Sequence, residues 1–247
     1  VLTFDEEEDI VKYTISKANG RIPIVVGSGS NDTAIAIWQA QRFEKMGADA
    51  LLVITPYYNK TNEEGMYKHF EMVAKSVTCP IILYNVPSRT GCSLSINNLK
   101  RLKELENIVG IKEASGNISY VSKVAKLVDD NFALYSGNDD IVVPLMSLGG
   151  SGVISVAANI MPYAMHDLVY TYLNGDVVDA KNKQLAYLEV IDSLFYEVNP
   201  IPVKQALNHL GLEAGPCRLP LFDMDKELAK KMYNLIDNSD VVYKWQK

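Results

Sequence analysis

A lysine and a tyrosine lie at the ends of two successive apolar segments of this chain. Lys112 ends the strand-like segment "IVGIK" (108–112), and Tyr84 stands near the end of "PIILYNVP" (80–87). Desolvation lowers the pKa of a lysine and makes the free amine available as a nucleophile towards a carbonyl carbon. A neighbouring phenol can then move protons to and from the carbinolamine that forms. The two residue types therefore indicate Schiff-base chemistry, provided that the fold brings them together.

Taken singly, each of these residues has an ordinary explanation. A lysine at a strand end commonly carries a solvated charge on an apolar stem, and a tyrosine there commonly packs as an amphipathic side chain. Arg89, in "NVPSRTG", would alone be a loop arginine in a turn marked by Pro87 and Gly91. The catalytic interpretation depends on the combination, because these residues and Tyr58 of "TPYYN" fall on one predicted face.

Short apolar segments alternate with longer amphipathic ones, which predicts alternating strands and helices. The predicted strands are 22–29, 50–56, 80–87, 108–115, 132–139 and 152–159. The predicted helices are 31–47, 62–77, 96–106, 118–130 and 141–149, and the chain from Pro162 onward is predicted to be helix and loop. The strands are continuously apolar, as parallel strands covered on both faces should be. Such units, without a Rossmann glycine fingerprint, favour an α/β fold of the (β/α)₈ TIM-barrel class.

The number of predicted strands is smaller than a closed barrel of this class needs. We find six strands, whereas the class has eight. Thr3 and Glu6 form a capping-box pattern, so the chain begins at a helix start. We therefore expect two strands and a helix that precede Val1 to be absent from this chain. The expected organisation is a barrel portion over 1–160 and a C-terminal helical region over 161–247, packed on the barrel.

Composition excludes several classes of protein. Of the 247 residues, 48% are hydrophobic and 22% are charged, which is typical of a globular chain with a sizeable core. The net charge is −6 and no basic cluster occurs, so nucleic-acid binding is not expected. No apolar segment is long enough to span a membrane, and the first residues do not resemble a signal peptide. Three scattered cysteines favour a reduced, cytoplasmic protein: Cys79, Cys92 and Cys217.

Neither a metal nor a cofactor is expected. Three histidines lie on predicted helices, far apart in sequence and without a ligand at suitable spacing: His69, His166 and His209. The glycine-rich "GSGSND" (27–32) and "LGGSG" (148–152) are interpreted as turns instead of phosphate cradles. Lys204, in "NPIPVK", is a second candidate nucleophile, but it does not lie at a strand end.

Several motifs together resemble those of one known family. "YNVPSRTG" is followed by "GIKEASGN", whose lysine stands 28 residues after the tyrosine, and "TPYYNK", "SGNDD", "GVISV" and "NPIPVK" stand in the expected order. The chain resembles the dihydrodipicolinate synthase (4-hydroxy-tetrahydrodipicolinate synthase) family, which are pyruvate-dependent class I aldolases. This resemblance implies condensation of pyruvate with L-aspartate 4-semialdehyde to give 4-hydroxy-tetrahydrodipicolinate, in lysine and diaminopimelate biosynthesis.

The resemblance also implies three catalytic residues. Lys112 would form the Schiff base with pyruvate, and Tyr84 would donate and accept protons beside it. Tyr58 would come from a neighbouring subunit to complete a proton relay, so the implied assembly is a homodimer or a homotetramer.

The substrate-binding residues implied by the resemblance are Arg89, Gly137 and Ile154. Arg89 would bind the carboxylate of the semialdehyde, and Gly137 and Ile154 would line the pyruvate pocket through backbone groups. Two alternatives stay open. One is a sister aldolase, such as N-acetylneuraminate lyase or a keto-deoxy sugar-acid aldolase; these share Tyr84 and Lys112 but usually lack the arginine. The other is a catalytically silent barrel that acts as a binding module, because the family's Thr-Thr-Gly-Glu stretch would stand before Val1.

The resemblance finally predicts that lysine does not inhibit this protein. Lysine-inhibited members use a histidine and a glutamate at positions that correspond here to Phe4 and Ile35. An ammonium group needs an anionic partner once it is desolvated. Ile35 cannot supply one, although Glu7 stands nearby in the sequence.

Overall fold

The structure, a computed structural model, describes residues 2–242 of the chain. These residues divide into two compact units. The first contains the chain up to Gly137 together with Leu148–Ser151, and the second contains Asn138–Ser147 and the described residues from Gly152 onward. The division follows the packing of the chain and not one cut in the sequence.

Five parallel strands form the centre of the first unit. They pair in chain order: β1 (Val25–Ser28), β2 (Ala50–Ile54), β3 (Ile81–Asn85), β4 (Ile108–Glu113) and β5 (Ala133–Ser136). Each lies inside a predicted apolar segment but is shorter than it. Leu51, Leu83 and Ile111 are fully buried, as expected for strands covered on both faces. The predicted α/β class with parallel strands is therefore confirmed for this unit.

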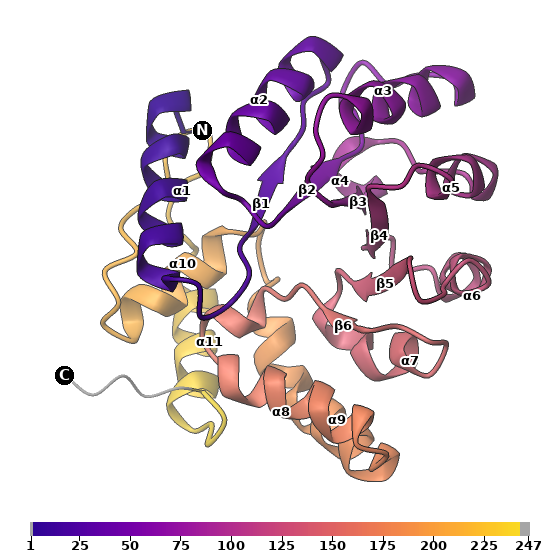
Figure 1. Cartoon of the computed structure of the whole chain (residues 1–247). Helices are drawn as coiled ribbons and strands as arrows, with labels where there is room; N and C mark the ends of the chain where they lie inside the picture. The colour runs from indigo at the N-terminus through magenta and orange to yellow at the C-terminus, as the bar shows by residue number, and fades with distance from the viewer. Residues whose placement is uncertain (1, 243–247) are drawn as a thin grey trace. The chain divides into compact units, whose positions relative to one another are not determined.

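Helices of the first unit cover the outer side of this sheet (Figure 1). They are α2 (Thr33–Met46), α3 (Glu63–Lys75), α5 (Ile96–Lys103) and α6 (Ile118–Ala125); the unit also contains α1 (Phe4–Ala18), which contacts α2, and the short helix α4 (Pro87–Thr90). The predicted capping box at the start of α1 is confirmed, since Thr3 and Glu6 each bond the backbone of the other. Helix α2 begins at the Asp32 cap and ends at Gly47, whose φ of 95° suits glycine.

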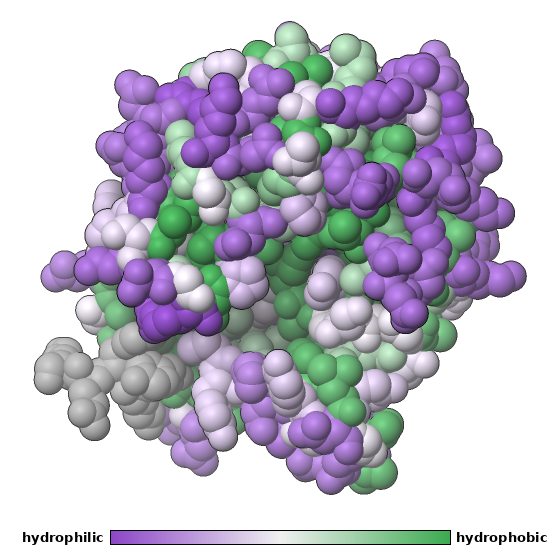
Figure 2. All heavy atoms as spheres, viewed as in Figure 1, coloured by the Kyte–Doolittle hydropathy of each residue, from purple (hydrophilic) through white to green (hydrophobic). Residues whose placement is uncertain are grey.

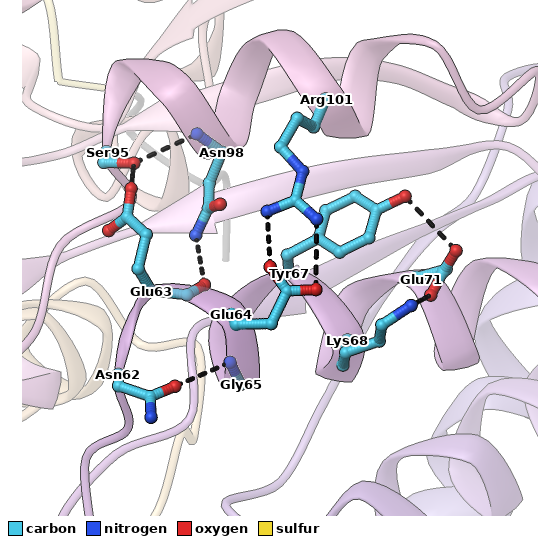
Figure 3. Close-up of polar contacts among 10 residues, drawn as sticks. All are labelled: Asn62, Glu63, Glu64, Gly65, Tyr67, Lys68, Glu71, Ser95, Asn98 and Arg101. Atoms are coloured by element: carbon cyan, nitrogen blue, oxygen red, sulfur yellow. Dashed lines mark hydrogen bonds and ion pairs between the residues drawn. The ribbon is translucent and has the colours of Figure 1, made fainter.

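Polar contacts hold α3 and α5 side by side (Figure 3). The Arg101 guanidinium forms two hydrogen bonds with the Glu64 carboxylate, of 2.7 and 3.1 Å, and lies 3.7 Å from the centre of the Tyr67 ring. The buried Asn98 side chain donates to the backbone oxygen of Glu63 at 2.8 Å. These contacts hold α5 against α3.

The second unit is mainly helical. It contains α7 (Val142–Met146), β6 (Gly152–Val153), α8 (Pro162–Leu173), α9 (Val177–Ser193), α10 (Ile201–His209), α11 (Lys226–Asp237) and two short 3₁₀ turns, η1 (Asp139–Ile141) and η2 (Ala157–Asn159). Its core includes fully buried Leu168 and Met232. The prediction of helix and loop from Pro162 onward is confirmed within the described residues.

The sixth predicted strand is mostly wrong. Only Gly152–Val153 is extended as β6, and Ala157–Asn159 forms the 3₁₀ turn η2. The Asp139 carboxylate accepts hydrogen bonds of 3.0 Å from the backbone N–H groups of both Val156 and Ala157. These donors are therefore committed to a side chain and not to a strand ladder, which ends the strand early.

Hydrophilic residues gather over α2, α3 and α5 on the face shown in Figure 2. This distribution fits helices that bury their other side against the sheet. Within residues 2–242, no helix combines the length and the apolar character that crossing a membrane would require.

Candidate active site

Tyr84 and Lys112 meet at the C-terminal ends of β3 and β4. They are direct partners in the parallel register, so both side chains project from the same face of the sheet. The Lys112 Nζ atom lies 4.3 Å from the centre of the Tyr84 ring. Burial raises the pKa of the Tyr84 phenol, and the positive charge of Arg89 opposes this only in part. The phenol is therefore protonated at neutral pH and lies beside the amine.

Gly137 leaves the space that the Lys112 side chain occupies. A Cβ atom on Gly137 would lie 2.5 Å from the Ala114 Cβ and 3.1 Å from the Lys112 Cε. The Gly137 N–H donates to the Glu113 backbone oxygen at 2.7 Å, which places this glycine beside the end of β4. The structure therefore brings Gly137 together with the Tyr84–Lys112 pair. Ile154 belongs to the second unit, where it follows β6 and is half-buried.

Arg89 lies on the short helix α4, which we predicted as a loop. Pro87 occupies the first turn of α4, where its missing N–H costs no helical hydrogen bond. Gly91 ends the helix with a φ of 72°. The helix is one turn long and Arg89 is an exposed residue on it.

Two contacts tie the Arg89 helix to the segment that follows β2. The Thr55 hydroxyl donates to the Thr90 hydroxyl at 3.1 Å, and the Cys92 thiol donates to the Pro56 backbone oxygen at 3.1 Å. Tyr57 and Tyr58 follow in the same segment. These contacts connect the segment that carries Tyr58 to the helix that carries Arg89.

Tyr58 projects away from the packed part of its own chain. Its side chain is 89% exposed, and its φ of 69° is unusual for a residue other than glycine. The neighbouring Asn59 side chain donates to the Asn31 backbone oxygen at 3.1 Å, which helps to hold this turn. The structure therefore does not pack Tyr58 against other side chains of its own unit.

Two further buried polar residues lie at the strand ends, and the sequence prediction assigned neither of them a role. The Asn85 amide donates to the Glu113 carboxylate at 2.7 Å, and the two residues are 0% and 1% exposed. Burial raises the pKa of Glu113, although hydrogen bonds from Ser115 and Asn85 oppose the rise. The available signal was their position, since each follows directly after Tyr84 or Lys112 in an otherwise apolar segment.

The other candidate residues lie elsewhere. Lys204 lines a pocket of about 540 Å³ in the second unit, together with Asn208 and Tyr233. The three histidines lie on α3, α8 and α10, as predicted: His69 contacts Thr33, His166 stacks on Tyr170 and His209 pairs with Asp237. Across residues 2–242, no three His, Cys, Asp or Glu side chains are grouped so that they could hold a metal ion.

Comparison with known proteins identifies similar sequences and folds. The sequence model of the dihydrodipicolinate synthetase family matches residues 1–239. The 4-hydroxy-tetrahydrodipicolinate synthase of Acetivibrio thermocellus is 50% identical over 223 residues, which are 90% of this chain and 76% of that protein. The enzyme of the same name from Clostridium novyi is 49% identical over 237 residues, which are 96% of this chain and 80% of that protein.

Solved structures agree with the sequence matches. The crystal structure of dihydrodipicolinate synthase from Aquifex aeolicus superimposes with a TM-score of 0.95 at 39% identity and covers 99% of this chain and 84% of that one. The structure of the enzyme from Cyanidioschyzon merolae with lysine bound gives a TM-score of 0.93 at 35% identity and covers 96% and 81%.

Proposed function

Since this chain belongs to the dihydrodipicolinate synthetase family, we propose that it condenses pyruvate with L-aspartate 4-semialdehyde to give 4-hydroxy-tetrahydrodipicolinate. The observation that carries this proposal is the register pair of Tyr84 and Lys112, with 4.3 Å between the ammonium nitrogen and the ring centre. A lyase that works through a Schiff base needs this amine and a proton carrier within reach of each other.

The first half of the reaction attaches pyruvate to the protein. The Lys112 amine attacks the ketone carbon, and the resulting carbinolamine loses water to become an iminium ion. Tyr84 supplies a proton to the departing hydroxyl. The iminium nitrogen withdraws electrons, so the pyruvate methyl group loses a proton and an enamine forms. Because the iminium acts as the electron sink, no step requires a metal ion.

The second half of the reaction uses the enamine carbon as the nucleophile. It attacks the aldehyde carbon of the semialdehyde, and a new carbon–carbon bond and a hydroxyl group form. The amino group of the semialdehyde then attacks the iminium carbon. This closes the ring and breaks the bond to Lys112, which leaves as a free amine.

Substrate binding is assigned to three residues in this proposal. The Arg89 guanidinium pairs with the semialdehyde carboxylate, which suits its planar set of donors. Gly137 and Ile154 line the pyruvate site through backbone groups. Exposure of Arg89 and the lack of space for a side chain at Gly137 support this assignment.

Tyr58 acts on a neighbouring copy of the chain in this proposal. Its 89% exposure on a backbone with positive φ supports the assignment, because a strained and exposed aromatic residue gains little within one chain. The assembly is accordingly a homodimer or a homotetramer. The proposed working fold is a (β/α)₈ barrel, to which 1–160 contribute the barrel portion and 161–247 the helical region. Cytoplasmic operation is part of the proposal and rests on three free cysteines.

Borohydride trapping with pyruvate tests this function. Reduction in the presence of pyruvate should add one pyruvyl unit to the protein, and peptide mass spectrometry should place it on Lys112. Lys112→Ala should abolish the label. The matched control is Lys204→Ala, which removes the lysine of the 540 Å³ pocket and should leave labelling intact. A label on Lys204, or on no lysine, would refute the assignment.

The identity of the second substrate needs its own measurement. The wild-type protein should consume aspartate semialdehyde faster than aldehydes of the sugar-acid series. Arg89→Ala should raise the KM for the semialdehyde while pyruvate labelling of Lys112 continues. Equal turnover of a sugar aldehyde would favour the sister aldolases instead.

A further inference from the structure

We propose that Asn85 and Glu113 form a strand-end bridge that holds Tyr84 and Lys112 in register and connects them to the segment that follows the Arg89 helix, α4. Both are positioning residues, because they act through neighbours and not on a substrate. The inference rests on the proposed function, since the residues that it positions are those of the proposed reaction.

The strand-end bridge stands one residue beyond the reactive pair. Tyr84 is the register partner of Lys112, and Asn85 is the register partner of Glu113. Side chains alternate between the two faces of a sheet. The bridge therefore lies on the opposite face of the sheet from Tyr84 and Lys112, and it joins the ends of the same two strands.

Each polar atom of the bridge has a partner. The Asn85 Nδ2 donates to Glu113 Oε2 at 2.7 Å, and Glu113 Oε1 accepts from the Ser115 N–H at 2.6 Å. The Asn85 Oδ1 accepts from the Leu94 N–H at 3.0 Å. A buried polar pair with these partners favours one arrangement of the chain, because another arrangement leaves a buried group without a partner.

The apolar residues of β3 and β4 do not fix the register of these strands by themselves. Their pairing is irregular between Ile81 and Ile82, where the register shifts. A slip of one residue at the other end would move Tyr84 to the opposite face, away from Lys112. The apolar residues of β3 do not resist such a slip, since Ile81, Ile82 and Leu83 are all buried. The Asn85–Glu113 hydrogen bond is lost in any other register.

The bridge also binds the segment that follows the Arg89 helix, α4. Leu94 follows α4 and is fully buried, and its backbone N–H is bound by Asn85. Its carbonyl oxygen accepts a hydrogen bond of 2.6 Å from the Tyr120 hydroxyl. Changes at Asn85 should therefore affect both imine formation and the KM for the semialdehyde. A change at Tyr120 should affect only the KM.

A polarity swap tests the bridge. In Asn85→Asp, a carboxylate faces the Glu113 carboxylate, and neither can donate. In Glu113→Gln, the new amide NH₂ faces another donor, either the Asn85 NH₂ or the Ser115 N–H. In the double variant, Gln at 113 donates to Asp at 85, and both remaining oxygens still accept from Leu94 and Ser115. Each single variant should slow borohydride-trappable imine formation by about tenfold or more, as expected for a displaced reactive group. The double variant should recover to within about threefold of the wild type.

The matched control separates positioning from loss of stability. Asn98→Asp makes the same substitution at another buried amide of the first unit, where Asn98 donates to a backbone oxygen. It should lower the melting temperature without slowing imine formation. The bridge is refuted if Asn98→Asp slows imine formation as much as Asn85→Asp at an equal melting temperature, or if the double variant stays as slow as the single variants.

Tyr120→Phe tests the second connection. It should raise the KM for the semialdehyde about threefold or more and leave the rate of imine formation unchanged. An unchanged KM would refute the connection to the Arg89 helix.

Amide hydrogen exchange keeps the inference distinct from the proposed function. The Ala114 N–H donates to the backbone oxygen of Asn85, and the Gly137 N–H donates to the backbone oxygen of Glu113. Their exchange should speed up in both single variants and slow again in the double variant. A wild type that forms no imine would refute the proposed function. Exchange rates of the Ala114 and Gly137 amides that are the same in the wild type and the variants would refute the bridge.

Discussion

The Thr55 hydroxyl donates a hydrogen bond of 3.1 Å to the Thr90 hydroxyl, and the two residues are only 0% and 3% exposed. The Thr90 hydroxyl in turn donates to the Cys92 backbone oxygen at 3.0 Å. Thr55 directly follows β2 and Thr90 ends α4, so this chain of bonds joins the tyrosine-bearing segment to the Arg89 helix. It lies in the interior, where a missing partner cannot be replaced by water.

Thr90→Val should therefore destabilise the protein and weaken semialdehyde binding. The valine has nearly the same shape but leaves the Thr55 hydroxyl without its acceptor. The expected loss in the free energy of unfolding is about 1–3 kcal/mol, with a raised KM for the semialdehyde. Urea denaturation and initial rates measure the two effects. Thr14→Val, at an exposed position of α1, is the control and should cost less than about 0.5 kcal/mol; equal losses at the two sites would contradict the prediction.

Tyr84→Phe should slow the reaction by about 10²- to 10⁴-fold, because it removes the proton carrier beside Lys112. Burial raises the pKa of Tyr84 above its usual value of about 10. Its phenol therefore stays protonated throughout neutral and mildly alkaline conditions, and no loss of activity below about pH 10 should come from its ionisation. Stopped-flow rates of pyruvate binding as a function of pH measure this. The control is Tyr13→Phe, on the exposed side of α1, which should leave the rate unchanged. If Tyr84→Phe also reacts at the wild-type rate, Tyr84 has no proton-transfer role.

Gly137→Ala should impair imine formation although glycine to alanine is a small change. The new methyl group would lie 2.5 Å from the Ala114 Cβ and 3.1 Å from the Lys112 Cε, so the lysine stem must move. We expect at least about a tenfold lower rate of imine formation. Gly27→Ala, at a strand glycine with no atom within 4 Å of its added Cβ, is the matched control. Should both variants react at the wild-type rate, Gly137 does not shape the lysine site.

Glu44 should stabilise the protein at neutral pH and not in acid. Burial alone would raise its pKa, but hydrogen bonds from Thr78 and Cys79 outweigh this and hold the pKa below its usual value. A folded-state pKa below the unfolded value gives stability that is present above pH 4.5 and is lost as the pH falls through the folded value. Glu44→Gln should lower the free energy of unfolding by about 1 kcal/mol at pH 7, and the difference should shrink below pH 4.5. A difference that persists unchanged at pH 3 would contradict this origin.

Lysine should inhibit this protein weakly or not at all. The two positions that would supply the histidine and the glutamate carry Phe4 and Ile35. The Phe4 ring instead packs edge-on against Trp38, with 4.8 Å between the ring centres. An incoming ammonium group would lose water at an apolar surface without a paired charge. Initial rates at increasing lysine should stay flat up to about 1 mM, the range of weak binding. Saturable inhibition below that concentration would show that Glu7 or another group compensates.

The sequence by itself determined the features that depend on neighbouring residues. The apolar segments that contain β3 and β4 end beside Tyr84 and Lys112, so their position at strand ends was predictable. The capping box of Thr3 and Glu6 was predictable for the same reason, because its two partners are three residues apart. Parallel strand order then followed from the alternation of strand and helix.

Tertiary structure alone decided the contacts between distant residues. Asn85 and Glu113 are 28 residues apart, and only the parallel register makes them partners in a buried hydrogen bond. The predicted strand at 152–159 ended early because the Asp139 carboxylate, which lies earlier in the chain, takes the N–H groups of Val156 and Ala157. The secondary-structure preferences of neighbouring residues cannot show which acceptor takes a backbone N–H group. The free energy of a buried polar group depends on the partner that the folded chain places beside it.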